Sequence, residues 1–187
     1  MNNLPKLLIS IGHLEISIIA GLIDEHNNFK LLEKLSFSID GMNDNKISDI
    51  DKITNLIKKN ILSIEQKVNH AFNNVILILD NFDISFLNLS GFKKLNGTQI
   101  HKENITYILN SLKSCVDEFE KKKKILHIFN SEHCLDNKKI DNLPIGLFGD
   151  FYSHELSCAL INQNDYENLK IIFQKCNLNI RKILVDS

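Results

Sequence analysis

Residues that restrict or loosen the backbone are scarce in this chain of 187 residues, which has two prolines and seven glycines. Three of them, Pro144, Gly146 and Gly149, lie close together near the end of the segment 125–149. Proline fixes φ, and glycine adopts conformations that other residues avoid, so this cluster predicts a turn held in one shape. The segment separates a long first part of the chain from a C-terminal strand, helix and strand.

Long apolar runs, closely paired cysteines and an excess of basic charge are also missing. No run approaches the roughly 18 apolar residues of a membrane-spanning helix, and the N-terminus lacks the pattern of a signal peptide. We therefore expect the four cysteines to be reduced thiols of a cytosolic protein. Lys and Arg number 22 against 23 Asp and Glu, which argues against a nucleic-acid module driven by bulk charge. The dense basic run Lys121–Lys124 is typical of a solvated helix end.

The histidines and cysteines do not form a recognisable metal or nucleophile motif. The nearest approach to a cluster has spacings of six, one, twenty and four, which match no paired zinc pattern, so we expect no metal site. No nucleophile elbow or oxyanion loop accompanies a cysteine, and the carboxylates are scattered over loops and helix faces. Asp80 and Asp83 flank a strand end and fit a solvated turn. The residues of that possible cluster are His127, His133, Cys134, His154 and Cys158.

The first forty residues predict three antiparallel strands. Residues 6–11 alternate loosely between apolar and polar side chains, and residues 15–23 are apolar and rich in β-branched residues. Gly12-His13 between them fits a tight hairpin turn. Residues 29–37 complete the set.

A helix and a buried strand are predicted next. Ser48, with Asp51 three residues later, has the pattern of a capping box, and apolar residues then recur at helical spacing to about His70. The continuous apolar run Val75–Leu79 is too short for a helix and predicts a central strand covered on both faces.

The pattern changes after residue 81. An alternating stretch over residues 82–88 predicts a half-exposed strand, and Gly91 and Gly97 are predicted to lie in the loop after it. A second amphipathic helix is predicted over residues 105–119. The elements predicted beyond it are strands at 125–129 and 154–161, a helix at 163–175 and a strand at 180–185. In the alternating stretch, Phe82, Ile84 and Phe86 are predicted to face the core, with Asp83, Ser85 and Leu87 facing outward.

This order of elements predicts an α/β protein in which one domain interrupts another. The inserted unit, with the order strand, helix, strand, strand, covers residues 81–161. The interrupted domain consists of residues 1–80 and 162–187. The first hairpin, residues 10–15, is a candidate phosphate loop because a glycine lets backbone N–H groups approach phosphate oxygens. By itself that signal is weak, and an ordinary hairpin is the more frequent outcome.

Five segments, taken in order, resemble the bacterial cell-division protein FtsA, an actin-like family, over its N-terminal half. Segment 125–149 is the most specific match, because the family has a similar strand, acidic turn and Pro-hydrophobic-Gly stretch there. The other four are similar to the family's phosphate hairpin, the loop into its first helix, the strand entering its inserted subdomain, and its return helix and strand. They are Lys6–Asp24, Phe37–Ile53, Val75–Gly91 and Asn168–Ser187.

The resemblance implies a fold. It is an actin-like, ribonuclease H-type subdomain 1A, interrupted by subdomain 1C of the strand-helix-strand-strand type called SHS2. It also implies that this chain ends before the second phosphate loop, the adenosine-binding residues and subdomains 2A and 2B. The C-terminal membrane-targeting helix and the region that contacts the tubulin-like FtsZ would lie beyond it as well, so we expect no membrane anchor in this chain.

The phosphate hairpin departs from the family pattern at two positions. The family usually carries an acidic residue before Ile-Gly and a basic residue three positions after the Gly, where this chain has Ser10 and Glu15. A carboxylate in place of an ammonium near phosphate changes an attraction of about 4 kcal/mol at ~4 Å into a similar repulsion. The swing of roughly 8 kcal/mol equals the binding energy of a micromolar ligand. We therefore expect Ser10, Gly12, His13 and Glu15 to form a degenerate hairpin that binds no nucleotide.

The resemblance implies a non-enzymatic division protein, truncated or degenerate, that works by protein–protein contact through subdomain 1C. In the family, that subdomain mediates self-association and contact with later division proteins. The expected location is the cytoplasm, at the division site on the inner face of the membrane. The residues expected to meet a partner are Asp83, Ser85 and Leu87.

Two alternatives remain open. The chain could be half of a split actin-like protein that binds ATP once the other half is supplied. It could instead be an SHS2-containing actin-like protein of the pilus-assembly type.

Overall fold

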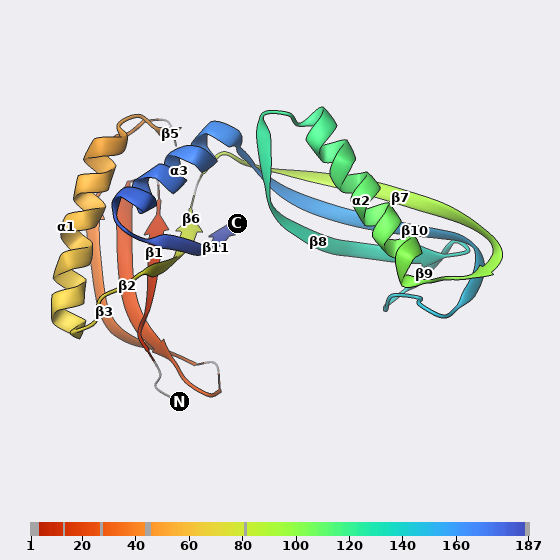
Figure 1. The fold of residues 1–187 in the computed structure, drawn as a ribbon, viewed down its shortest axis with the longest axis horizontal. Helices are drawn as coiled ribbons and strands as arrows, with labels where there is room; N and C mark the ends of the chain where they lie inside the picture. Colours follow the sequence, from red (N-terminus) through yellow and green to blue (C-terminus); the bar gives the residue numbers. More distant parts are fainter. Residues whose placement is uncertain (1–3, 13, 27, 44–45, 81, 186–187) are drawn as a thin grey trace. The chain divides into compact units, whose positions relative to one another are not determined.

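A computed structural model describes residues 4–12, 14–26, 28–43, 46–80 and 82–185, and it divides the chain into two compact units (Figure 1). Unit 1 consists of Met1–Ile84 together with Asn164–Ser187, and unit 2 is Ser85–Gln163. The insertion predicted at residues 81–161 differs from unit 2 by a few residues at each end.

Unit 1 is built on a five-stranded mixed sheet. The sheet order is β11-β6-β1-β2-β3. The first hairpin makes β1 and β2 antiparallel, and β3 is antiparallel to β2, whereas β6 and β11 run parallel to β1. The strands are β1 (Lys6–Ile11), β2 (Glu15–Ile23), β3 (Phe29–Ser38), β6 (Asn74–Leu79) and β11 (Asn179–Val185), with a separate short pair, β4 (Met42–Asn43) and β5 (Lys46–Ile47).

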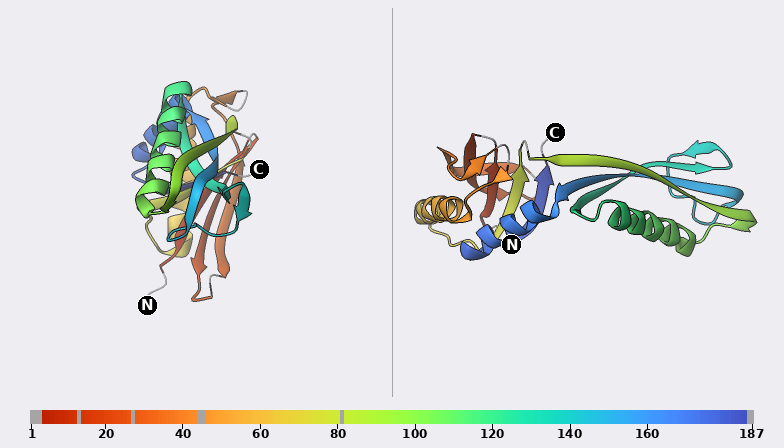
Figure 2. Two further views of the ribbon diagram at one scale, coloured as in Figure 1. Left: turned by 90° about the vertical axis from the view of Figure 1, so that its right-hand side faces the viewer. Right: turned by 90° about the horizontal axis from the view of Figure 1, so that it is seen from above.

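Two helices, α1 (Ile50–Val68) and α3 (Gln163–Lys175), cover one face of this sheet (Figure 2). Their ends meet where the Cys176 thiol lies 3.7 Å from the Thr54 carbonyl oxygen. The strand residues beneath them are buried, because alternate residues of a strand point to the same side. These are Leu7, Ile9, Ile11, Ile16, Ile18, Ala20, Val75, Leu77 and Leu79.

The opposite face of the sheet is covered less. Ile76 and Ile78 of β6, and their neighbours Leu8 and Ile19, are half-buried. The prediction that residues 75–79 are covered on both faces is therefore right for one face only. The apolar run marks the strand correctly, but a run alone cannot tell how completely its second face is covered.

The start of α1 corrects a predicted cap. The N-cap is Asp49, not Ser48, and its carboxylate accepts a hydrogen bond from the Lys52 N–H at 3.0 Å. Ser48 instead belongs to the turn before the helix, where its N–H donates to the Gly41 carbonyl at 2.8 Å. Gly41 has a φ of 101°, which a residue with a side chain rarely adopts, so this turn is set by glycine.

Unit 2 is a four-stranded sheet with one helix. The sheet order is β7-β10-β8-β9, and α2 lies along one face (Figure 2). Two clusters fill the space between that face and α2, around Leu112 and around Val116. The elements are β7 (Ile84–Gln99), α2 (Lys102–Phe119), β8 (Lys123–Leu135), β9 (Lys138–Ile140) and β10 (Phe148–Asn162).

Two glycines predicted to lie in a loop lie inside β7 instead, so that prediction is wrong. A Cβ atom on Gly91 would lie 2.7 Å from Ile108 Cγ2 of α2. Gly91 therefore allows the helix to approach the strand closely rather than breaking the strand. Gly97, with a φ of 75°, lies near the far end of β7.

The turn predicted around Pro144 and Gly146 is confirmed. The Leu147 N–H donates to the Pro144 carbonyl at 3.1 Å, and Gly146 has a φ of 90°. The Gly146 N–H in turn donates to the carbonyl of Ile100, just before α2. This turn leads directly into β10.

Candidate functional site

The predicted phosphate hairpin joins β1 to β2 in unit 1. Ser10 is a half-buried residue of β1 that pairs with Ser17, and Glu15 is the exposed first residue of β2. The Gly12 N–H donates to the Glu15 carbonyl at 2.9 Å, and the Ser17 hydroxyl donates to the Glu15 carboxylate at 3.4 Å. His13 lies outside the described residues.

Asp80 lies directly against this hairpin. Because β1 and β6 are parallel, their carboxyl ends meet at one edge of the sheet, and the Asp80 N–H donates to the Ile11 carbonyl at 3.0 Å. A Cβ atom on Gly12 would be 3.2 Å from Asp80 Oδ2, so a side chain there would crowd the Asp80 carboxylate. Asp80 was assigned to a solvated turn from sequence, and the parallel strand pairing is the signal that could have placed it here.

A buried carboxyl, Asp165, lies in unit 1 near the start of α3. Asp165 is 7% exposed. Burial raises its pKa, the nearby Lys46 ammonium lowers it, and repulsion from Asp83 raises it again. The Lys46 ammonium therefore partly offsets the negative charge of Asp165.

These charges limit what the carboxyl edge of unit 1 can bind. The Asp80 carboxylate lies against Gly12, and the Glu15 carboxylate, which accepts from Ser17, belongs to the first residue of β2, so a phosphate placed at the hairpin would meet negative charge. Within the described ranges, no group of three or more His, Cys, Asp or Glu side chains is arranged to hold a metal ion. The described hairpin thus has the glycine of a phosphate loop without its electrostatics.

The predicted interface at the start of β7 needs a correction. Leu87 packs against the buried cluster under α2, whereas Phe86 is 58% exposed, so the predicted facing of these two residues is reversed. The Ser85 hydroxyl accepts a hydrogen bond from Lys123 Nζ at 2.9 Å. Asp83, which precedes the strand, is exposed as expected. The reversal arises because odd-numbered residues of β7 face α2, and the same phase brings Gly91 against that helix.

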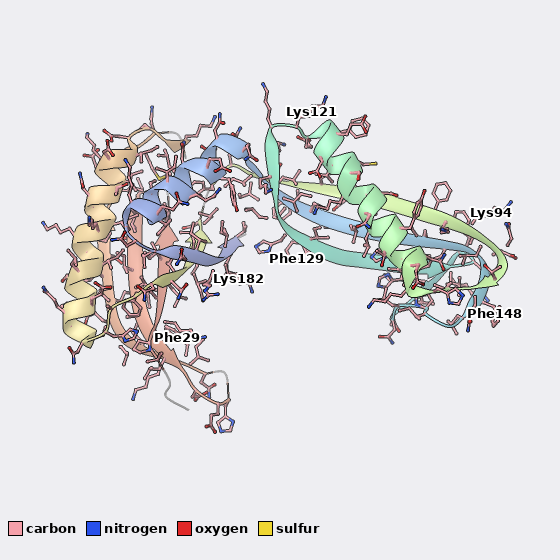
Figure 3. All side chains as sticks on the ribbon, viewed as in Figure 1. Phe29, Lys94, Lys121, Phe129, Phe148 and Lys182 are labelled. Carbon is pink, nitrogen blue, oxygen red and sulfur yellow. The ribbon has the colours of Figure 1, made fainter. Side chains whose placement is uncertain are left out.

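The other face of the unit 2 sheet carries exposed phenylalanines. Phe92 of β7 and Phe151 of β10 stack with their ring centroids 5.2 Å apart, and they are 67% and 36% exposed. Phe129 of β8 is 49% exposed and shares this face (Figure 3). It pairs with Ser157 of β10, so the two side chains lie on the same side of the sheet. The Ser157 hydroxyl donates to Asn88 of β7, which lies on the side of Phe86 and Phe92. We call Phe86, Phe92, Phe129 and Phe151 the phenylalanine face. Sequence reasoning missed it because it assigned Phe86 to the core.

The structure brings together only some of the residues weighed as metal ligands. The Tyr152 hydroxyl lies 3.3 Å from His133 Nδ1 and 3.1 Å from His154 Nδ1. Burial, and then the charge of His133, lower the pKa of His154 to about 4. Cys134 pairs with Ser153 on the opposite face of the sheet from His133.

The remaining two candidates lie apart from that pair of histidines. Cys158 belongs to the apolar cluster near Val116, and His127 pairs with Ala159 on the same side as Phe129. The His133–Tyr152–His154 group is thus a buried polar cluster in the core of unit 2.

The fold of the chain is actin-like. The chain is similar in structure to a chain of the solved "PilM-PilN type IV pilus biogenesis complex", with a TM-score of 0.61 at 9% sequence identity. The superposed region covers 98% of this chain and 48% of the other. No family model matches the sequence.

Within this class, the resemblance to the cell division protein FtsA is confirmed. FtsA of Buchnera aphidicola subsp. Schizaphis graminum is 21% identical over 176 residues, which are 94% of this chain and 42% of that protein. FtsA of Buchnera aphidicola subsp. Baizongia pistaciae is 31% identical over 147 residues, 77% of this chain and 34% of that protein. The chain therefore spans less than half the length of these curated relatives. Among the described helices, none has the length and apolar character needed to cross a membrane.

Proposed function

We propose that this chain is an FtsA-like division protein that works by protein–protein contact and not by catalysis. Unit 1 would be subdomain 1A. Unit 2 would be subdomain 1C of the SHS2 type, because its main elements, β7, α2, β8 and β10, follow the order strand, helix, strand, strand. The proposed place of action is the division site, on the cytoplasmic face of the membrane.

The phenylalanine face is the observation that carries this proposal. Aromatic side chains are enriched at the centres of protein interfaces and supply much of their binding energy. Burying one phenylalanine side chain contributes about 2 kcal/mol. Four exposed phenylalanines lie on the sheet face of unit 2 opposite its helix α2, and they form the kind of patch that soluble proteins use for contact. The partners would be other division proteins or a second copy of this chain.

The charges around Gly12 support action without a nucleotide. The Asp80 carboxylate lies against Gly12, and Glu15 stands where the family usually carries a basic residue. ATP titrated into the chain in a calorimeter should give no binding heat at micromolar concentrations. Micromolar affinity would contradict this part of the proposal and favour half of a split ATP-binding protein.

Contact through the phenylalanine face is tested by replacing its stacked pair. The double variant F92S/F151S removes two exposed rings, while the control Y107S removes an exposed ring from α2, on the other side of the sheet. Self-association by analytical ultracentrifugation and two-hybrid contact with other division proteins are compared. We expect at least about 10-fold weaker association for the double variant and no change for Y107S.

Localisation of fluorescent fusions to these variants provides a second measurement. The unsubstituted chain should gather at midcell, and F92S/F151S should be dispersed. Equal association and equal localisation of the two variants would refute the proposed surface. Foci elsewhere on the envelope would favour a pilus-assembly role instead.

A further inference from the structure

A cavity of about 500 Å³ opens in unit 1 at the amino ends of its parallel strands. This edge of the sheet is the opposite one from the hairpin at Gly12, because Lys6 and Asn74 begin the strands that end at Ile11 and Leu79. The cavity is therefore separate from the predicted phosphate site. Its size falls within the range of small-ligand pockets.

The apolar part of the cavity comes from the ends of β1 and β6 and from the segment between α1 and β6. Its accessible apolar side chains are those of Leu4, which is 61% exposed, and the half-buried Ile76, while Phe72 and Val75 of the lining are buried. The ring of Phe72 is held by an edge-to-face contact with His70, with the centroids 5.0 Å apart. The cavity therefore offers apolar side chains to a hydrocarbon group.

The polar part of the cavity consists of hydrogen-bond donors and basic groups. Lys6, His70 and Arg181 are among the lining residues, and none of the described lining residues carries a carboxylate. The Arg181 Nε–H donates to Asn74 Oδ1 at 2.8 Å. This bond fixes one edge of the guanidinium and leaves its other N–H groups and the Asn74 amide N–H groups as donors. The nearby carboxylate of Glu65 does not line the cavity and accepts a hydrogen bond from the Phe72 N–H.

We propose that this cavity binds an amphipathic carboxylate, in which an apolar body packs on Leu4 and Ile76 and the carboxylate pairs with Arg181 and Lys6. A planar guanidinium held at one edge matches the two oxygens of a carboxylate. The ligand is either a small apolar acid or the C-terminal carboxylate of an apolar polypeptide. The proposal does not depend on the division role.

The test uses the full chain and follows its backbone amide signals by NMR during titration with octanoate. Octanol, which has the same hydrocarbon length without the charge, is the matched ligand control. An apolar tetrapeptide with a free C-terminal carboxylate, and the same peptide with an amidated end, test the second source. We expect octanoate or the free-acid peptide to shift the signals of residues 73–76, and octanol and the amidated peptide to have no effect at the same concentration.

Two variants assign the binding to this cavity. R181Q should weaken carboxylate binding at least about 10-fold, because it removes a charge-assisted pair. K182Q is the control, since Lys182 is the next residue of β11, is exposed, carries the same charge and does not line the cavity (Figure 3). Both are surface changes, and circular dichroism checks that they fold. Equal binding of octanoate and octanol, equal loss in R181Q and K182Q, or no binding by either carboxylate would overturn the proposal.

Discussion

At the scale of single residues, the buried cluster in unit 2 shows how the fold changes the chemistry of a side chain. His154 is 1% exposed and contacts Tyr152 and His133. Burial first, and the charge of His133 second, lower the pKa of His154 from 6.5 to about 4. Burial also raises the pKa of Tyr152 to about 12, so its hydroxyl keeps its proton. His154 and Tyr152 are therefore both neutral at pH 7.

This lowered pKa predicts a loss of stability in acid. The unfolded chain protonates His154 near pH 6.5 and the folded chain only near pH 4, so the folded state is at a disadvantage between these values. The free energy of unfolding should fall by up to about 3 kcal/mol as the pH drops through this range. Urea unfolding at several pH values measures it.

The variant H154F should lose this part of the pH dependence, since phenylalanine fills a similar space and cannot be protonated. H101Q, which changes an exposed histidine, should keep the pH dependence of the unsubstituted chain. A pH dependence that is the same in H154F and in the unsubstituted chain would show that His154 is not its source.

At the scale of elements, the start of α1 depends on one carboxylate. Asp49 caps the helix by accepting a hydrogen bond from the Lys52 N–H, while Ser48 uses its backbone in the preceding turn. We expect D49A to lower the free energy of unfolding by about 1 kcal/mol and S48A to leave it within about 0.5 kcal/mol. Urea titration of both variants checks this. A larger loss of stability in S48A than in D49A would show that Ser48 is the N-cap of α1, as predicted from sequence.

The contact between β7 and α2 depends on the absence of a side chain. A methyl group on Gly91 would meet Ile108 and Leu112, the latter with 3.1 Å between Cβ and Cγ. The variant G91A should therefore destabilise unit 2 by about 1–3 kcal/mol through overpacking. S90A, one residue earlier on the exposed face, is the control. Equal stability of G91A and S90A in thermal unfolding would show that α2 can shift without penalty.

Elements with strong periodicity were predicted well. The final helix was placed at residues 163–175, which are the bounds of α3, because its apolar residues recur at helical spacing. β7 was predicted too short, since glycine was treated as a strand breaker before its contact with α2 was known. The side of β7 that faces the core was also predicted wrongly. In a strand with apolar residues on both sides, such as Phe86 and Leu87, alternation alone does not identify the side that packs against a helix.

At the scale of the whole molecule, each unit has its own core. The core of unit 1 lies between its sheet and the helices α1 and α3, and that of unit 2 lies between its sheet and α2. We therefore expect two thermal transitions in a calorimetric scan of the full chain. D49A should lower one of them, and G91A should lower the other. A single transition shifted by both substitutions would mean that the units unfold as one.

The candidate sites were predictable in unequal degree. The hairpin with Ser10, Gly12 and Glu15 was found from sequence because its residues are consecutive. Asp80 was not predicted to lie at this hairpin, because roughly seventy residues of sequence separate it from Gly12. Only the parallel pairing of β1 and β6 brings the two residues together. The phenylalanine face draws on three strands and has no local sequence pattern.

The sequence by itself determined the α/β class, most of the strands and helices, the turn at Pro144, and the charge of the first hairpin. Those properties depend on residues that are near neighbours along the chain. Only the tertiary structure decided which side of β7 faces α2, that Asp80 meets Gly12, and that Lys6, His70 and Arg181 line one cavity. Each of these depends on strand order and register, which are set by packing between segments far apart in sequence.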